Sequence, residues 1–510
     1  MPLETELKLR LDPHNVPALL RHPLLKGGTS RSTRRLRSVY FDTPALDLWR
    51  AGVSLRIRHD GDYRIQTVKF GGGVTGGLHE RHEIETRIAH DAPDFAALAA
   101  GEAAAHFASH ELRAHLKPLV VTDFRRTSVI VTPAAGVAIE VCIDRGTIAG
   151  GDTHEPLCEV EFEMKSGPAW RAHQFALRLM ADLPLLVEDR SKALRGMDLL
   201  TGREDEPVKS GRSPLAPVLL TGEAFKQLIA ACLAHFIANQ RGMLETNDPE
   251  YLHQMRVALR RMRSVFTTFA PLFPPEVLAP PVAEMRWLGA ILGDARDWDV
   301  FKHESLPPLV ARYPRHAGLT ALQRSTARLQ QRAKRSARRA VASARGQGLL
   351  LGLSAWISAE TWREALDDSQ LLALHRPAVE FARDRLDALS ERVLKRGRRF
   401  GKLAPRELHK LRIAAKQLRY AAEFFTPLFD DPKAGAYRAT LARLQDVLGT
   451  YNDAVKVAHC GELAAIGLTG TTVSEARGLL LGWSAGIEDM GSRELKPVWK
   501  NFCAEDAFWR

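Results

Sequence analysis

MPLETELKLRL, residues 1–11, alternates between two kinds of side chain. Leu3, Leu7, Leu9 and Leu11 are apolar, whereas positions 4, 6, 8 and 10 hold Glu, Glu, Lys and Arg. This alternation is typical of a β-strand with one apolar and one charged face. Taken alone, the charged face would lie in solvent, where ion pairs contribute little.

Other predicted strands in the first 200 residues carry the same segregation of charge. EVEFEMK at 159–165 puts three glutamates and one lysine on one face and three apolar residues on the other. Arg56 and Arg58 share a face, and so do Arg35 and Arg37. The predicted strands cover 3–11, 34–42, 53–59, 63–70, 79–88, 120–131, 137–145 and 156–165, and helical patterns cover 93–107 and 168–181.

These charged faces predict an eight-stranded antiparallel β-barrel with a polar interior. Opposed carboxylates in such a cavity would hold Mg²⁺ or Mn²⁺, because hard divalent cations prefer oxygen ligands. Rings of Arg and Lys around them would bind a chain of phosphates. Unpaired buried charges are costly, so a metal ion and a polyanion would make this interior tolerable.

The net charge of +12 is unevenly distributed along the 510 residues. Residues 1–200 hold 26 Lys and Arg and 26 Asp and Glu, so the whole excess lies in residues 201–510. A basic excess usually indicates a polyanionic partner. The chain has no apolar run of about 18–20 residues that would span a bilayer. Its five cysteines are scattered, so we expect free thiols, a cytoplasmic location and no membrane partner.

The chain divides into two parts with different periodicity. Residues 1–202 form the predicted barrel domain, with its flanking helices, and the charged, Pro-rich stretch 203–216 is a linker. Residues 217–510 follow a period of 3.6 and predict an all-helical domain.

The helical part contains an internal repeat. HQMRVALRRMR begins at His253 and HKLRIAAKQLR at His409; PLF occurs at 271–273 and 427–429; LGDARD at 292–297 matches LGTYND at 448–453. Each pair is separated by 156 residues, so the register holds without a gap. We therefore expect a duplicated bundle with copies of about 217–365 and 366–510.

Each copy carries a cationic stripe on one helix face. The spacing is i, i+3, i+7 and i+10 in both copies, and two such helices side by side would form a basic groove. The predicted polyanion-binding residues are His253, Arg256, Arg260, Arg263, His409, Arg412, Lys416 and Arg419. Further basic clusters at 324–339 and 395–402 are equally consistent with a solvated surface.

The first part resembles the CYTH domains, or triphosphate tunnel metalloenzymes. ETELK at 4–8 matches their ExExK signature, and further matches are VYFDTPALDLWRAGVSLRIR (39–58), QTVK (66–69), EVEFEMKSG (159–167) and SKALRGMDLL (191–200). The resemblance implies a tunnel enzyme that hydrolyses a triphosphate with a divalent metal.

Carried over by position, the resemblance implies roles for individual residues. Glu4, Glu6 and Lys8 would be catalytic, and the metal ligands would be Glu4, Glu6, Glu159 and Glu161. Substrate phosphates would be bound by Lys8, Arg37, Arg56, Arg58, Lys69, Arg126, Lys165 and Lys192. Of Arg125 and Arg126, one should face away from the tunnel.

The second part resembles the CHAD family, through the two His-led motifs and the LGDARDWDV (292–300) and LGTYNDA (448–454) segments. The resemblance implies two four-helix bundles related by pseudo-twofold symmetry, with a basic surface that binds inorganic polyphosphate.

Together these features favour a metal-dependent inorganic triphosphatase, with a helical domain that binds polyphosphate or docks on polyphosphate granules. One alternative is a non-catalytic polyphosphate scaffold. Another is the same barrel acting on an organic triphosphate, either thiamine triphosphate or ATP, including class IV adenylate cyclase chemistry. Nucleic acid is a weaker candidate, because the basic half lacks the interleaved aromatic residues that stack single-stranded bases.

Overall fold

The computed structural model describes residues 3–98, 102–203 and 205–510, with the side chains of 102, 405, 451–453 and 487–493 left aside. The chain forms two units. One comprises residues 1–206 and 342–360, and the other comprises 207–341 and 361–510. Among the described residues, no helix is long and apolar enough to cross a membrane.

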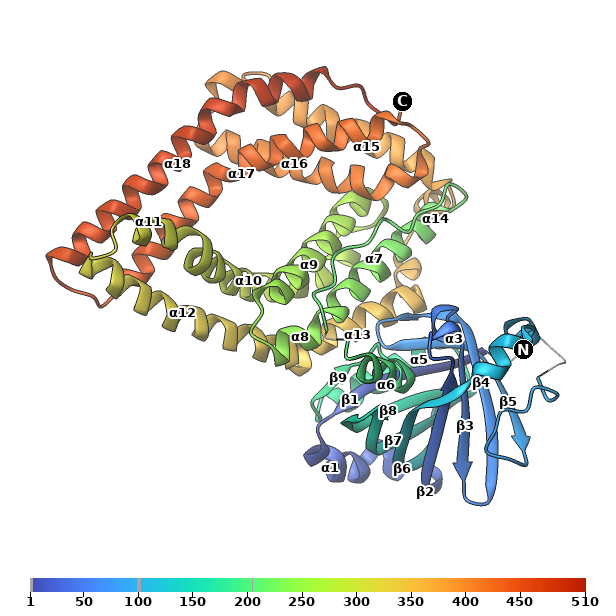
Figure 1. The fold of residues 1–510 in the computed structure, drawn as a ribbon. Helices are drawn as coiled ribbons and strands as arrows, with labels where there is room; N and C mark the ends of the chain where they lie inside the picture. The colour runs from blue at the N-terminus through green and yellow to red at the C-terminus, as the bar shows by residue number, and fades with distance from the viewer. Residues whose placement is uncertain (1–2, 99–101, 204) are drawn as a thin grey trace. The chain divides into compact units, whose positions relative to one another are not determined.

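The first unit is built on an antiparallel sheet that closes on itself (Figure 1). Its order is β5-β4-β3-β2-β6-β7-β8-β1, and pairing of β1 with β5 completes the ring. The strands are β1 (Leu3–Leu11), β2 (Thr29–Asp42), β3 (Ser54–Asp60), β4 (Tyr63–Thr75), β5 (Leu78–Ile88), β6 (Lys117–Ala134), β7 (Val137–Gly150) and β8 (Thr153–Ser166). This confirms the predicted eight-stranded barrel. A short β9 (Leu185–Val187) adds to the end of β1.

Two predicted boundaries differ from the structure. The stretch 93–107 is not a continuous helix: it contains a 3-10 turn at Glu102–Phe107, and residues 99–101 lie outside the described part. The Asp94 side chain instead accepts hydrogen bonds from the backbone N–H groups of Ala96 and Ala97, which favours a turn. Strand β4 also continues through most of the Gly-rich stretch 71–77.

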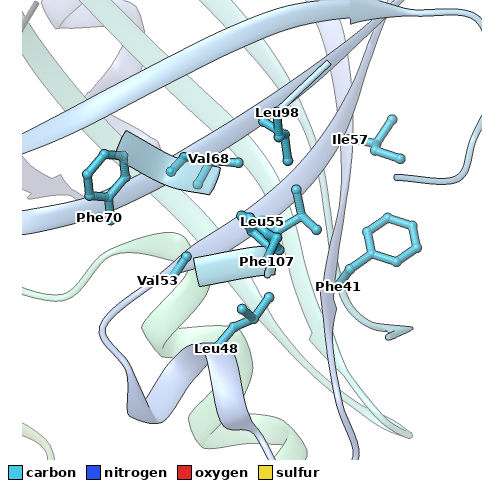
Figure 2. Close-up of a cluster of buried hydrophobic side chains, with 10 residues drawn as sticks. Phe41, Leu48, Val53, Leu55, Ile57, Val68, Phe70, Leu98 and Phe107 are labelled. Atoms are coloured by element: carbon cyan, nitrogen blue, oxygen red, sulfur yellow. The ribbon is translucent and has the colours of Figure 1, made fainter. Parts of the chain in front are cut away.

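Apolar residues cover the outside of the barrel. Between β2, β3 and β4 they form a cluster with Leu48, Leu98 and Phe107 (Figure 2). The helices of this unit are α1 (Val16–Arg21), α2 (Pro23–Lys26), α3 (Asp47–Arg50), α4 (His110–His115), α5 (Trp170–Met180), α6 (Lys192–Thr201) and α13 (Ala344–Ala359). Because the apolar contacts lie outside, the barrel interior is left to polar side chains.

Helix α13 belongs to this unit although it follows the first helical copy in sequence. It packs on α5 and β9, and its Gln347 side chain accepts a hydrogen bond from the Val187 backbone N–H at 2.9 Å. A Cβ at Gly76, at the β4–β5 turn, would clash with Ser354 of α13. Sequence analysis assigns 342–360 to the helical domain, and the structure groups it with the barrel.

The second unit is all-helical and follows the predicted 156-residue repeat. Its helices are α7 (Thr221–Ala238), α8 (Gln240–Glu245), α9 (Pro249–Phe269), α10 (Pro275–Val300), α11 (Leu306–Arg312), α12 (Ala317–Ala342), α14 (Asp368–Leu374), α15 (Ala378–Gly397), α16 (Pro405–Phe425), α17 (Lys433–Ala465) and α18 (Thr471–Ala504). The bounds of α9 and α16 differ by 156 at both ends. The long helices α17 and α18 run antiparallel along each other (Figure 1).

The two copies also pair through the backbone. The segments that lead into α7 and α15 exchange hydrogen bonds: Thr221 N–H donates to Arg376 C=O and Ala378 N–H donates to Leu219 C=O, both at 2.9 Å. Helices α9 and α16 pack against each other, and Arg261 pairs with Glu423 across them at 2.9 Å. The cationic stripes of both copies therefore lie on neighbouring helices.

The packing of α13 gives a first prediction. Gln347→Ala removes an acceptor from the buried amide of Val187, and the lost hydrogen bond should cost about 1–3 kcal/mol locally. Hydrogen exchange of the peptide containing Val187 should accelerate by roughly 5- to 150-fold. The control is Gly348→Ala, where the new methyl group meets no atom within 4 Å and raises helix propensity. Equal exchange in both variants would show that α13 is not a fixed part of the barrel unit.

Candidate active site

The barrel closes around the charged faces of its strands. In β1, Glu4, Glu6 and Lys8 line the cavity, while Leu7 and Leu9 are buried on the opposite face. The same alternation brings charged residues inward from β3, β5, β7 and β8. The result is a cavity of about 230 Å³ lined mostly by polar groups, with Leu36, Phe124 and Ala193 among its apolar residues.

Three buried carboxylates form a cluster, and one of them, Glu161, lines the cavity. Oxygen atoms of Asp144, Glu159 and Glu161 all lie within 4.8 Å of one another. The Lys192 ammonium contacts all three, at 2.8 Å from Asp144 and from Glu161 and 2.5 Å from Glu159. Lys8 pairs with Glu161 as well, and with Glu6 at 2.6 Å. Like charges this close would repel, so the lysines hold the cluster together.

Arg126 completes this cluster. Its guanidinium donates two parallel hydrogen bonds to Asp144, at 2.7 Å each, and also bonds to Glu161. The neighbouring Arg125 is exposed on the opposite face of β6. Such bidentate Arg–carboxylate pairs have a fixed geometry, so the carboxylates are positioned before any ligand binds.

The facing wall carries a second group of charges. Lys69 pairs with Glu4, and with Glu83 at 3.3 Å. Arg56 lies 3.4 Å from Glu83 and Arg58 lies 4.0 Å from Glu85. The Nε atoms of both arginines are buried with no partner among the described residues. These donors are available to an anion in the cavity.

Burial and mutual charge shift the pKa values of these groups in opposite directions. Burial, reinforced by Glu6, raises the pKa of Glu4 to about 7. Burial also acts to raise the pKa of Glu6, but Lys8 and Lys69 outweigh it and lower the pKa to about 2. Burial, together with Arg56 and Arg126, lowers the pKa of Arg58 to about 10. The cavity thus contains both a proton-holding carboxyl and a strongly ionised one.

A second charged site lies on the helical unit. A Cβ at Gly293 of α10 would come within 3.0 Å of the Arg256 guanidinium, and one at Gly289 within 3.9 Å of that of Arg263. Because both positions are glycine, these two side chains can lie across the α10 backbone. Arg260 lies over the Tyr420 ring of α16, 5.9 Å from its centroid.

Lys416 lies at the centre of this cluster. Burial, followed by the charges of Arg260, Arg412 and two further arginines of α9, lowers the pKa of Lys416 to about 7. Within the described part of the chain, Lys416 makes no ion pair, and the buried Arg260 Nε has no partner. Repulsion among these cations would be relieved by a bound anion.

Comparison with known proteins identifies both halves. Residues 2–197 match the CYTH domain and residues 227–460 match the CHAD domain. The chain carries a CYTH domain followed by a CHAD domain. The CYTH domain is similar to an inorganic triphosphatase of Haemophilus influenzae, with 31% identity over 194 residues, which is 38% of this chain and 54% of that protein. The chain thus matches about half the length of this curated relative.

The CHAD domain is similar to a solved structure, the CHAD domain from the plant Ricinus communis. The two share 30% sequence identity with a TM-score of 0.51, over 59% of this chain and 98% of that one. The predicted duplicated helical fold is therefore the CHAD fold.

In the CYTH domain, most of the predicted site residues come together. Glu4, Glu6, Lys8, Arg56, Arg58, Lys69, Arg126, Glu161 and Lys192 line the cavity, and Glu159 joins the carboxylate cluster. Glu4 and Glu6 lie outside the three-carboxylate cluster, although Lys8 bridges Glu6 to Glu161. Lys165 lines the cavity, but 40% of its side chain is exposed and it pairs with Glu163 and Glu140.

Arg37 does not enter the cavity. It is exposed, because in β2 the residues that line the cavity are Arg34, Leu36 and Tyr40. Arg37 therefore lies on the outer face with Arg35, which pairs with Asp123. We withdraw the assignment of Arg37 to phosphate binding.

Sequence reasoning did not assign several residues that the structure brings to the cavity. Asp144 lies in the carboxylate cluster, and the cavity lining also includes Tyr40, His79, Arg81, Glu83 and Glu85. The alternation LHERHEIETRI at 78–88 carries the signal for the β5 residues, because every charged inward position there is odd-numbered.

In the CHAD domain, the predicted residues divide into two groups. Burial and the charges of Arg412 and of the arginines of α9 lower the pKa of Lys416, and burial with Arg296 lowers the pKa of His253. His409 is exposed, and Arg419 is held by Glu423 at 3.0 Å and Gln445 at 2.6 Å. Asn452 and Asp453 of the repeat lie outside the residues whose side chains are described.

The buried carboxyl of Asp189 is linked by hydrogen bonds to the backbone of the strand that carries Lys8. Asp189 accepts a hydrogen bond from the Gly77 N–H at 2.6 Å, and Gly77 C=O accepts one from the Lys8 N–H at 2.9 Å. Burial raises the pKa of Asp189 to about 7. A carboxyl whose pKa is raised on folding stabilises the protein below its unfolded pKa of about 3.9, and this contribution is lost as the pH rises through about 7.

Asp189→Asn should therefore change the pH dependence of stability. Asparagine keeps an acceptor for the Gly77 N–H but cannot ionise. Thermal unfolding at pH 5, 6, 7 and 8 should show the variant gaining melting temperature over the unmodified protein as the pH rises. The control is Asp152→Asn, at an exposed position, which should show a constant difference. A constant difference for Asp189→Asn as well would contradict the assigned ionisation.

Proposed function

We propose that the CYTH domain is a divalent-metal-dependent triphosphatase whose substrate is inorganic triphosphate. The observation that carries this proposal is the buried cluster of Asp144, Glu159 and Glu161, whose Glu161 lines a cavity together with Arg and Lys side chains. The similarity to the inorganic triphosphatase of Haemophilus influenzae supports it.

The carboxylate cluster fits Mg²⁺ or Mn²⁺. All its donor atoms are oxygen and lie close together, as hard divalent cations require. Asp144, Glu159 and Glu161 would hold the ion, with Glu6 and Glu4 on the adjoining strand. When bound, the ion supplies charge stabilisation for phosphate oxygens and acidifies water.

The cations of the cavity would bind the substrate. Arg56 and Arg58 line the cavity near Glu83 and Glu85, and their buried Nε atoms have no hydrogen-bond partner in the described structure. A bent phosphate chain would bind both guanidinium groups. Lys69 and Lys192 would neutralise charge on the terminal phosphoryl groups as it develops. In the free protein, burial and Glu6 raise the pKa of Glu4 to about 7, and a divalent cation bound beside it would favour its ionised form.

The cavity wall favours a bare triphosphate over an organic one. Phe124 is the aromatic residue that could stack on a base, but its ring is covered by Arg126 and Lys192, whose charged groups lie 5.6 and 5.1 Å from the centroid. Tyr40 lies beside Arg56, which lowers its pKa despite burial. ATP and thiamine triphosphate are the alternative substrates, and a non-catalytic scaffold is the alternative function.

We further propose that the CHAD domain binds inorganic polyphosphate through the stripe formed by α9 and α16. Arg256, Arg260 and Arg263 of α9 and Arg412 of α16 lie on two helices that pack together, and their charges lower the pKa of Lys416. Consecutive phosphates could each meet a guanidinium. Such binding would also place the protein on polyphosphate granules.

Glu161→Gln tests the enzymatic proposal. With Mg²⁺ or Mn²⁺, the full chain should release phosphate from inorganic triphosphate faster than from ATP, thiamine triphosphate or polyphosphate. Loss of the Glu161 charge should lower kcat/KM by about 10²–10⁴-fold. The control is Glu163→Gln, on the same strand but paired with Lys165 outside the cluster. Calorimetric titration of the variant and the unmodified protein with Mn²⁺ alone shows whether the loss of activity comes from weaker metal binding or from a slower chemical step.

The absence of release from every substrate would overturn the hydrolase and leave the scaffold alternative. Formation of a cyclic nucleotide from ATP, with no phosphate released from triphosphate, would instead indicate a cyclase. Chromatography of the products distinguishes these outcomes.

Arg260→Gln combined with Arg412→Gln tests polyphosphate binding. Each lost charge-assisted hydrogen bond should cost about 1.5–3 kcal/mol, so affinity for polyphosphate of defined length should fall by 100-fold or more, roughly, and the salt dependence should flatten. The control removes two charges from the other basic row, Arg324→Gln with Arg328→Gln on α12. Equal losses in both would show that polyphosphate does not select the α9–α16 stripe.

A further inference from the structure

The backbone of Lys8 lies at a corner of the barrel where one ladder of strand pairing ends and another begins. Strand β1 pairs with β5 over residues 3–7 and with β9 over residues 9–11, so Lys8 is the residue between the two ladders. Its N–H donates to Gly77 C=O at 2.9 Å, and its C=O accepts from Glu188 N–H at 3.2 Å. Both backbone groups of Lys8 therefore depend on this corner.

Helix α13 packs on the corner with one of its faces. Gln347 and Ser354 are seven residues apart, about two helical turns, and both are buried. The Gln347 side chain accepts a hydrogen bond at 2.9 Å from the N–H of Val187, the residue before Glu188. Ser354 lies so close to Gly76 that a Cβ there would clash with its Oγ. The two sides of the corner, β9 and the β4–β5 turn, thus both rest on α13.

The segment that follows β9 also delivers Lys192 to the cavity. The Asp189 carboxylate ties this segment to the Gly77 N–H at 2.6 Å, and the Ser191 side chain caps the start of α6. Lys192 is the first residue of α6 and contacts all three clustered carboxylates. It follows Val187 by only five residues, so a displacement of β9 would reach both lysines.

We propose that α13 is part of the triphosphate site and that Gln347 is a positioning residue for Lys8 and Lys192. The helix lies within the residues that match the CHAD domain, so a segment of CHAD sequence completes the CYTH site. The inference rests on the proposed triphosphatase, in which both lysines bind phosphate. Without the Gln347 contact β9 can shift, and a displacement of about 1 Å at reacting groups can cost up to about 10²-fold in rate.

The test uses Gln347→Met in the full chain, because Met has a similar length and its sulfur is only a weak acceptor. The matched control is Gln66→Met. Gln66 is also buried and bonds to the backbone of Asp94. It lies on the face of β4 that carries Val68 and the outer apolar cluster, and its hydrogen bonds go to the segment after β5 rather than to β9.

Both variants should lose thermal stability, but only one should change the site. In Gln347→Met, the Kd for pyrophosphate with Mn²⁺ present and the KM for triphosphate should rise by about 5-fold or more, with the number of binding sites per chain unchanged. In Gln66→Met both constants should stay the same, because loss of folded protein lowers the number of sites and not their affinity. Calorimetry with pyrophosphate, the expected product, needs no turnover.

Hydrogen exchange gives a second readout that needs neither ligand nor activity. In Gln347→Met, exchange should accelerate at Lys8 as well as at Val187, and in Gln66→Met at neither. Acceleration that stops at Val187 would overturn the positioning role, and so would a pyrophosphate Kd that is unchanged in Gln347→Met or rises equally in both variants. Failure of the unmodified chain to hydrolyse triphosphate would instead overturn the proposed function, and exchange at Lys8 would still decide the role of Gln347.

Discussion

Charge neutralisation inside a closed sheet is the constraint on which the CYTH domain depends. Pairing of β1 with β5 closes the barrel, and the inward face of every strand then loses most of its water. A carboxylate there is tolerated only if a cation meets it. Lys192 therefore contacts three carboxylates and Lys8 two, and Arg126 is held at two points by Asp144. The same closure sends the leucines of β1 outward, where they are buried and helix α5 packs against the strand.

In the proposed function, the metal ion and the anion each compensate charge that the other leaves unbalanced in the cavity. In the free protein, the amines of Lys192 and Lys8 neutralise the carboxylate cluster. A divalent cation on the same oxygens would take over that role, and the two amines would become available to phosphate. Binding of either ligand alone would leave uncompensated charge in a buried cavity, so the two should bind with positive coupling. The buried Nε donors of Arg56 and Arg58 add to this coupling, because they have no protein acceptor among the described residues.

The sequence predicts the barrel well because its decisive signals are local. Alternation in 3–11 and 159–165 identifies which residues face inward, and the structure puts Glu4, Glu6, Lys8 and Glu161 in the cavity. Arg37 shows where alternation is insufficient. The segment STRRLR has cations at 34, 35 and 37, so both alternating sets of side chains contain a cation. The pattern therefore does not indicate which set faces the cavity. Asp144 shares its strand with one other acid, Glu140, and only pairing of β7 with β8 sets Asp144 opposite Glu159. Helix α13 is apolar around most of its surface, and no face of it indicates that it packs on the barrel.

The CHAD domain shows how duplication can make a symmetric scaffold chemically asymmetric. Helices α9 and α16 begin and end at equivalent positions, and their packing brings both cationic stripes together. Yet the position that holds Arg260 in the first copy holds Lys416 in the second, and Ser264 is replaced by Tyr420. The Tyr420 ring contacts the guanidinium groups of both Arg260 and Arg419. Arginine keeps its charge in proteins, whereas burial and neighbouring cations lower the pKa of Lys416 to about 7. The second copy therefore has a titratable cation at the position where the first has a permanent one.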